Sequence, residues 1–235
     1  MITKKTADED FDFQTGEALL IDKPKGWTSF QAVRKIRNSI KVKKVGHAGT
    51  LDPMATGLLI LCTGKKTKEI SHFQDLLKVY EGIITLGKSS PSMDAETGIT
   101  REKPFEDVTE EMILKEKDKF SGRIMQIPPM YSAIKQNGKP LYKLARKGKE
   151  VVRKPREVEV YEFDIIKILL PDIHFRIKCS RSTYIRVIAN DLGNGLGCGG
   201  ILSELRRTNI GEYSVEEAFL PDEFAAKMRL SGRIV

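Results

Sequence analysis

Residues 172–179 alternate strictly between polar and apolar side chains, and this pattern constrains the fold more than any other feature of the chain. The apolar set is Ile173, Phe175, Ile177 and Cys179, and the polar set is Asp172, His174, Arg176 and Lys178. A period of two places one set on each face of a β-strand, as an antiparallel sheet with one solvated face requires. Residues 158–169, rich in β-branched and aromatic side chains, predict a second strand directly before it.

The remaining predicted elements are few and irregularly spaced. We expect short strands at 18–21 and 78–87. Helices are expected after a cap at Thr28 or Ser29 (packing Phe30, Val33, Ile36 and Ile40), from a cap at Thr109 to Ser121-Gly122, at 183–192 and at 201–207. Strands separated by irregular loops, with few helices, indicate an α+β fold and not a regular βαβ series.

Length and composition predict one catalytic domain. With 235 residues, of which 40% are hydrophobic, the chain can bury one sizeable core. We expect residues 1–16 to be a flexible tail and residues 17–235 to form the domain. No apolar run approaches the roughly 18 residues of a membrane span, and the start has no signal-peptide pattern, so a cytoplasmic protein is expected.

The distribution of basic residues favours a polyanionic partner. Forty Lys and Arg against thirty-two Asp and Glu give a net charge of +8. Residues 124–150 form a turn-rich excursion in which six Lys and Arg are interleaved with Tyr131 and Tyr142. A surface loop would explain this composition, but an RNA contact explains it better, because phosphates attract the cations and bases stack on the aromatic rings.

Several motif-based functions are excluded by spacing. The glycines from Gly195 to Gly200 match the dinucleotide-binding pattern but follow a predicted helix, where the motif needs a strand. Six residues separate Gly57 from Gly64, where a phosphate-binding loop has four. The zinc-binding pattern of base deaminases is absent, and the three cysteines include no Cys-x-x-Cys pair. We expect neither a metal nor a cofactor.

The segment Gly46–Leu58 is the strongest candidate for chemistry. It contains three glycines, Pro53 and a single acidic residue, Asp52, so its backbone can bend sharply and approach a ligand closely. An Asp-Pro pair in a loop is by itself usually turn chemistry.

The whole segment, however, resembles the signature loop of the TruB-type tRNA pseudouridine synthases. Five other segments resemble the family in the same order: Leu20–Gly26, Lys78–Gly82, Pro128–Lys135, Cys179–Arg186 and Leu202–Arg207. The resemblance therefore extends from about residue 18 to residue 211. It implies the pseudouridine-synthase fold, a mixed and mostly antiparallel sheet with flanking helices, in which residues 124–150 form an inserted thumb.

The resemblance also implies the activity, isomerisation of the T-loop uridine at tRNA position 55, and a role for each matching residue. Asp52 matches the catalytic aspartate, Arg186 the arginine that pairs with it, and Tyr80 the tyrosine that stacks on the target base. Tyr184 and Leu205 match residues that line the uracil pocket, and His47 matches a histidine that fills the space of the flipped nucleotide. Taken singly, Tyr80 and Leu205 would be interpreted as core residues and Arg186 as a surface charge.

Two differences from the family pattern stand out. Ala48 and Ser182 occupy positions where threonine and glycine are usual. The chain also ends twenty-four residues after Gly211, so we expect a short, stand-alone form without a C-terminal RNA-binding domain. We also expect a monomer. The alternatives are a non-catalytic RNA-binding or tRNA-folding factor, and a pseudouridine synthase acting on another RNA.

Overall fold

The computed structural model describes residues 1–6, 10–136 and 138–230, which divide into two compact units. Unit 1 comprises residues 1–81 and 205–235, and unit 2 comprises residues 82–204. The chain passes from one unit to the other within strand β4 (Lys78–Leu86) and again within strand β12 (Gly200–Ile210). Each unit contains buried apolar side chains of its own, among them Leu59 and Leu61 in unit 1 and Phe175 and Ile177 in unit 2.

Unit 1 is built on a mixed sheet in which strands pair in the order β1-β3-β12-β4. Strands β1 (Ala18–Lys23) and β3 (Thr56–Thr63) pair antiparallel, while β3 and β12 pair parallel, with Thr56 opposite Arg206. Strand β2 (Val45–His47) pairs with β3, and β13 (Tyr213–Ser214) pairs with β12. Parallel and antiparallel pairs in one sheet confirm the predicted mixed sheet.

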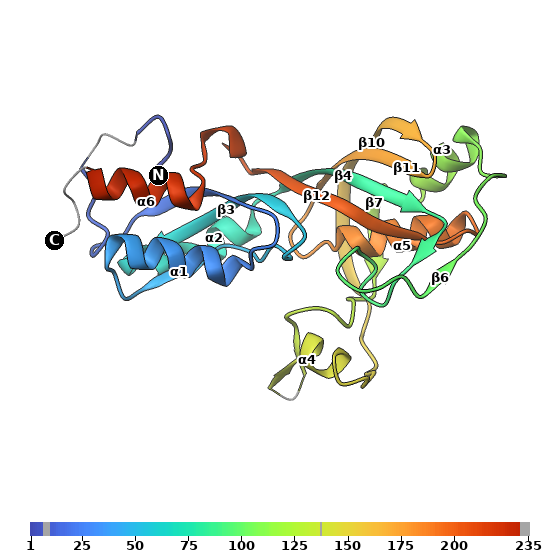
Figure 1. Ribbon diagram of the computed structural model, residues 1–235, viewed down its shortest axis with the longest axis horizontal. Helices are drawn as coiled ribbons and strands as arrows, with labels where there is room; N and C mark the ends of the chain where they lie inside the picture. The colour runs from blue at the N-terminus through green and yellow to red at the C-terminus, as the bar shows by residue number, and fades with distance from the viewer. Residues whose placement is uncertain (7–9, 137, 231–235) are drawn as a thin grey trace. The chain divides into compact units, whose positions relative to one another are not determined.

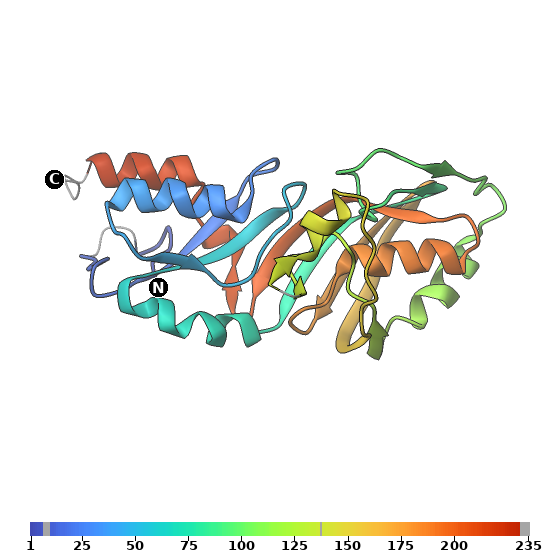
Figure 2. The ribbon, with the colours of Figure 1, turned by 90° about the horizontal axis from the view of Figure 1, so that it is seen from below.

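Both faces of this sheet are covered. Helices α1 (Ser29–Ile40) and α6 (Pro221–Leu230) lie side by side on one face (Figure 1) and pack on Leu59 and Leu61 of β3. The 3₁₀ helix η1 (Gly64–Glu69) and helix α2 (Ile70–Asp75) lie on the other side (Figure 2), where Phe73 joins Leu58 and Ile60 in a second cluster. A short 3₁₀ helix, η2 (Val215–Glu217), precedes α6.

Unit 2 contains the remaining parts of β12 and β4, and its strands pair in the order β12-β4-β11-β10-β7. Strand β10 (Arg156–Leu169) pairs antiparallel with β11 (Asp172–Cys179) on one side and with β7 (Gly122–Gln126) on the other. The alternation in 172–179 is confirmed: Ile173, Phe175, Ile177 and Cys179 are buried, and the polar residues between them are half-buried. Helices α3 (Glu110–Asp118), capped by Thr109, and α5 (Ile185–Gly195) complete the unit, with the short pair β5 (Lys88–Ser89) and β6 (Arg101–Glu102).

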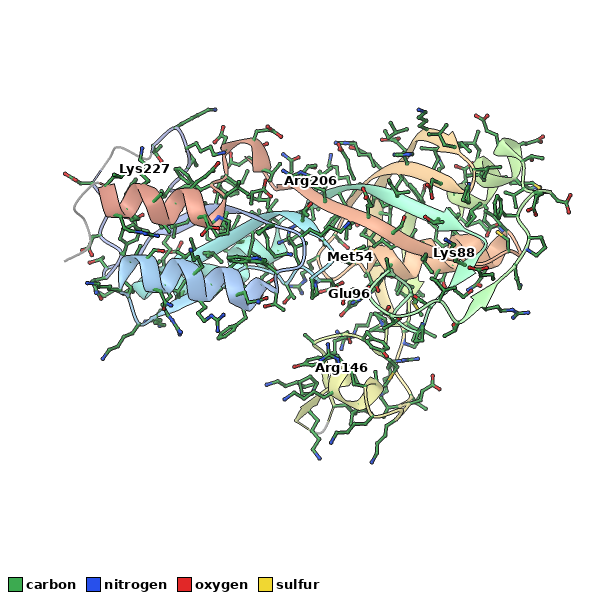
Figure 3. All side chains as sticks on the ribbon, viewed as in Figure 1. Met54, Lys88, Glu96, Arg146, Arg206 and Lys227 are labelled. Atoms are coloured by element: carbon green, nitrogen blue, oxygen red, sulfur yellow. The ribbon has the colours of Figure 1, made fainter. Side chains whose placement is uncertain are left out.

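The predicted thumb lies within unit 2. Between β7 and β10 the chain forms the hairpin of β8 (Lys135–Gln136) and β9 (Lys139–Pro140) and the helix α4 (Leu141–Ala145), which stand apart from the sheet of this unit (Figure 1). Its lysines and arginines from residue 135 to residue 149 are exposed. Arg146, labelled in Figure 3, places its guanidinium 5.6 Å from the centre of the Tyr142 ring.

Three local predictions are wrong. Residues 201–207 belong to strand β12 and not to a helix, because seven residues are too few to reveal a period and pairing with β3 decides the conformation. Phe30 is 62% exposed, since it falls on the helical stripe of Arg34 and Arg37 and not on that of Val33. The tail prediction fails at Ile2, which is fully buried and hydrogen bonds with Ala18 and Leu20. The part of that prediction concerning residues 7–9 lies outside the described residues.

Candidate active site

The loop between β2 and β3 carries Asp52 on a backbone that is fixed at several points. Strands β2 and β3 are adjacent and antiparallel, with His47 opposite Leu61, so the loop connects them at the same end of the strand pair. Ala48, Leu51, Met54 and Ala55 turn their side chains into the core, whereas Asp52 is half-buried. Gly26 donates to the Pro53 carbonyl at 2.8 Å, and the Ala55 N–H donates to the Asp52 carbonyl at 3.1 Å.

Ser29, the first residue of α1, holds the residue directly before Asp52. The Leu51 N–H donates to Ser29 Oγ at 2.8 Å, and Ser29 Oγ donates to the Leu51 carbonyl at 3.1 Å. Both residues are buried, so these hydrogen bonds are shielded from competing water. The start of α1 and the aspartate loop are therefore one rigid local structure.

Arg207 also holds the loop, a role that the sequence alone did not predict. It is 1% exposed, and its Nε donates to the Leu58 carbonyl at 2.7 Å while Nη2 donates to the Gly49 carbonyl at 3.2 Å. These two carbonyls stand on either side of Asp52 in the chain. Gly57 permits the close approach of the strands, because a Cβ there would lie 2.3 Å from the Arg207 carbonyl oxygen. The sequence placed Arg207 at the end of a predicted helix, residues 201–207, whereas it belongs to strand β12 and is buried.

His47 lies at the start of the same loop and is half-buried. Burial lowers the pKa of its imidazole below the usual 6.5, and the nearby Arg207 charge lowers it further, against a smaller opposing effect of a hydrogen bond with the Gly49 backbone. The neutral form of the side chain is therefore favoured. A neutral, half-buried ring is suited to stacking and to hydrogen bonding with a nucleotide.

Tyr80 and Leu205, the other site residues in unit 1, lie on β4 and β12 and are half-buried. Thr208 Oγ1 of β12 donates to the Val79 carbonyl of β4 at 3.4 Å. Arg206, labelled in Figure 3, donates from Nη1 and Nη2 to the two oxygens of Asp22 at 3.1 and 2.7 Å. This bidentate ion pair links β12 to the end of β1.

Tyr184 and Arg186 belong to unit 2, at the start of α5. The buried Arg186 donates from Nη1 to Asp94 Oδ2 at 3.1 Å and from Nη2 to the Tyr131 carbonyl at 2.8 Å, and its guanidinium lies 5.8 Å from the centre of the Tyr184 ring. Gln126 exchanges hydrogen bonds with the Tyr184 backbone N–H and carbonyl at 3.0 and 3.3 Å. The expected pairing of Arg186 with Asp52 stays a prediction.

Asp94 is a second residue that sequence reasoning missed. It is 1% exposed, and its Oδ1 accepts hydrogen bonds from Ser92 Oγ and from the Glu96 N–H. The signal was weak, because an Asp in a polar loop is usually a turn residue. Ser182, where the family pattern has glycine, adopts a φ of +63°, the left-handed region that glycine favours.

Two findings concern metals and membranes. Within residues 1–6, 10–136 and 138–230, no three His, Cys, Asp or Glu side chains are grouped so that they could hold a metal ion. Over the same residues, no helix has the length and apolar character needed to cross a bilayer. The expectation of a reaction without metal or cofactor remains to be tested by chelation.

The family comparison and the fold define the class of pseudouridylate synthases. Residues 37–185 match the TruB family pseudouridylate synthase N-terminal domain, and residues 186–230 match the tRNA pseudouridylate synthase B C-terminal domain. The chain belongs to the TruB family.

Individual relatives agree with this assignment. The chain is 51% identical over 208 residues to the tRNA pseudouridine synthase B of Chloroherpeton thalassium, covering 86% of each chain. It is 46% identical to that of Flavobacterium johnsoniae, covering 88% of this chain and 93% of the relative. Among solved structures it is similar to a chain of a Cbf5-Nop10-Gar1 complex, with a TM-score of 0.65, 30% identity and 86% of this chain covered. The match spans about half (51%) of that longer chain. The predicted α+β pseudouridine-synthase fold is thus confirmed.

Proposed function

We propose that this pseudouridine synthase isomerises the uridine at position 55 in the T-loop of tRNA, with Asp52 as the catalytic carboxylate. The observation that carries the proposal is the loop of Asp52, whose backbone is held by Ser29 on one side and by Arg207 on both sides of the aspartate. A carboxylate fixed in this way is preorganised for one attack geometry. Support for tRNA as the substrate comes from the relatives named tRNA pseudouridine synthase B.

The reaction breaks the bond between ribose C1′ and uracil N1, turns the base over and joins C1′ to C5, while C5 loses a proton and N1 gains one. No atom is oxidised or reduced. Asp52 either adds to the substrate or removes a ribose proton, and both routes need it ionised. Tyr80 stacks on the flipped base and assists transfer of the C5 proton. Tyr184 and Leu205 line the uracil pocket, and His47 fills the space that the flipped nucleotide leaves.

Arg186 serves this chemistry as a fixed positive charge. Its contacts with Asp94 and with the Tyr131 carbonyl restrict the guanidinium to one orientation, so that its positive charge is preorganised. Tyr131 lies in the predicted thumb, residues 124–150, whose exposed cations we assign to the phosphates of the T-arm. We expect the enzyme to act as a monomer, without a guide RNA, in the cytoplasm.

The test is to incubate the protein with an unmodified tRNA transcript and to map pseudouridine along the product. Product at position 55 alone, also in the presence of a chelator, supports the proposal. Product at another position would indicate a synthase of different specificity. No product, with tRNA still bound, would favour a non-catalytic RNA-binding or tRNA-folding factor. Loss of activity in chelator would reveal a metal requirement.

A further inference from the structure

Helix α1 carries an exposed aromatic ring on a stripe of cations. Residues 30, 34, 37 and 41 recur at intervals of three or four, so Phe30, Arg34, Arg37 and Lys41 share one side of the helix. Phe30 is 62% exposed, so that its ring is accessible for stacking. We call this set the α1 stripe.

The two arginines of the α1 stripe differ in exposure, Arg34 being exposed and Arg37 half-buried. The helix has no acidic residue anywhere from Ser29 to Ile40. Lys35, beside the stripe, forms an ion pair with Asp222 of α6, whereas Arg34 and Arg37 form none with any residue that the structure describes. An ordinary solvated helix face carries charges of both signs, so a purely cationic stripe favours an anionic partner.

The α1 stripe begins at the aspartate loop. Ser29, the neighbour of Phe30 in the chain, is hydrogen bonded in both directions to Leu51, which directly precedes Asp52. Phe30 follows Ser29 and Asp52 follows Leu51, so the Ser29–Leu51 contact links the start of the stripe to the proposed catalytic carboxylate. All four residues belong to unit 1. From there to Lys41 the stripe extends for about 16 Å along the helix, enough to follow several phosphates.

We propose that the α1 stripe is a second RNA-binding surface, on which Phe30 stacks against a base or ribose of the substrate RNA and Arg34 and Arg37 contact its phosphates. The inference rests on the proposed function for the identity of the RNA. It assigns to unit 1 a contact that is separate from the basic thumb of unit 2. A second copy of this chain fits the stripe poorly, because two such stripes would repel each other.

The test measures binding of an unmodified tRNA transcript between 50 and 200 mM salt, with Asp52→Asn as the background so that the RNA is not converted. Arg34→Ala with Arg37→Ala should weaken binding at least tenfold and reduce the slope of log affinity against log salt by about one for each arginine. Phe30→Ala should weaken binding about fivefold or more without changing that slope, since stacking releases no counterions.

Helix α6 supplies matched controls in the same unit. Arg229 and Leu230 are exposed, and Leu230 is 89% exposed, so Arg229→Ala and Leu230→Ala remove the same kinds of side chain from a surface without a proposed role. Circular dichroism of each variant checks that it is folded. If the α1 variants bind tRNA like the α6 controls, the inference is overturned. It is equally overturned if Phe30 instead controls cosedimentation with anionic lipid vesicles.

Failure of this inference can be told apart from failure of the proposed function. A wild-type protein that forms pseudouridine 55, with α1 variants that bind like the controls, would refute only the second surface. A wild-type protein that forms no pseudouridine, with α1 variants that lose RNA affinity and salt dependence as stated, would refute only the proposed reaction.

Discussion

Arg186 is paired inside unit 2 with Asp94, its Nη1 3.1 Å from Asp94 Oδ2, and the two side chains are only 6% and 1% exposed. Two opposite charges buried in contact are stable together, but either one alone is costly to bury. Asp94 is therefore a positioning residue for Arg186, and the carboxylate must be kept for the arginine to hold its orientation.

The first prediction removes this partner. Asp94→Asn should destabilise the protein by roughly 3 kcal/mol, because it leaves the Arg186 charge uncompensated. It should also reduce turnover about tenfold or more while tRNA affinity changes little. Urea unfolding and single-turnover kinetics measure the two effects. Asp164→Asn is the control, since Asp164 lies 3.7 Å from Arg176 in an exposed pair whose loss should cost at most about 1 kcal/mol. Equal effects of the two substitutions would contradict the assignment.

The second prediction concerns Arg207. Arg207→Lys keeps the buried charge but loses the pair of hydrogen bonds that the guanidinium donates to the Gly49 and Leu58 carbonyls. We expect a folded protein with near-normal tRNA affinity and a turnover reduced about tenfold, because the aspartate loop is no longer fixed. Arg206→Lys changes a neighbouring, half-buried arginine and should leave turnover much closer to wild type. A normal turnover in Arg207→Lys would show that the loop needs no such support.

The third prediction is a pH effect from His47. Its pKa is lower in the folded protein than the ordinary 6.5, so the unfolded chain binds a proton more readily. The stabilising contribution of His47 to the free energy of unfolding is complete above pH 6.5. It is lost as the pH falls from 6.5 through the lower pKa of the folded protein. Unfolding free energies at pH 7.5 and 5.5 should therefore differ less in His47→Gln than in wild type. His72→Gln, at an exposed histidine of α2, should retain the wild-type difference. An identical pH dependence in all three proteins would show that His47 is not its source.

The fourth prediction separates steric clash from backbone strain. Gly57 and Gly26 both have positive φ, +105° and +82°, but a Cβ would meet the Arg207 backbone at Gly57 and nothing within 4 Å at Gly26. Gly26→Ala should cost about 1 kcal/mol, the usual strain of the left-handed region. Gly57→Ala should cost at least about 3 kcal/mol and reduce activity, since β3 must move away from β12. Chemical denaturation gives both values, and comparable costs would show that the strand contact is not tight.

Sequence reasoning succeeded where local patterns carry the information. The alternation in 172–179 identified β11, and the cap at Thr28 identified the start of α1, where its side chain accepts from the Gln31 N–H as the first turn requires. The resemblance to the TruB family identified the loop of Asp52 as the candidate catalytic loop. Its catalytic role stays a prediction.

Most of the failures are questions of tertiary context. Arg207 and Asp94 are buried by partners more than ninety residues away in the chain, Leu58 and Arg186. Local sequence patterns do not predict contacts between residues so far apart in the chain. Residues 201–207 fit a helical spacing, but pairing with β3 makes them a strand, and Phe30 looked like a core residue until its neighbours on the helix proved to be arginines. The Phe30 ring, expected in the core, is exposed on the α1 stripe.

The most direct measurement is a single-turnover assay of Asp52→Asn on an unmodified tRNA transcript, run beside equilibrium binding of the same RNA. The substitution keeps the size and shape of the side chain but removes its charge. We predict near-wild-type affinity with no pseudouridine formed at position 55 over many wild-type half-times. Product formation by Asp52→Asn at an appreciable fraction of the wild-type rate would contradict the assignment of Asp52 as the catalytic carboxylate.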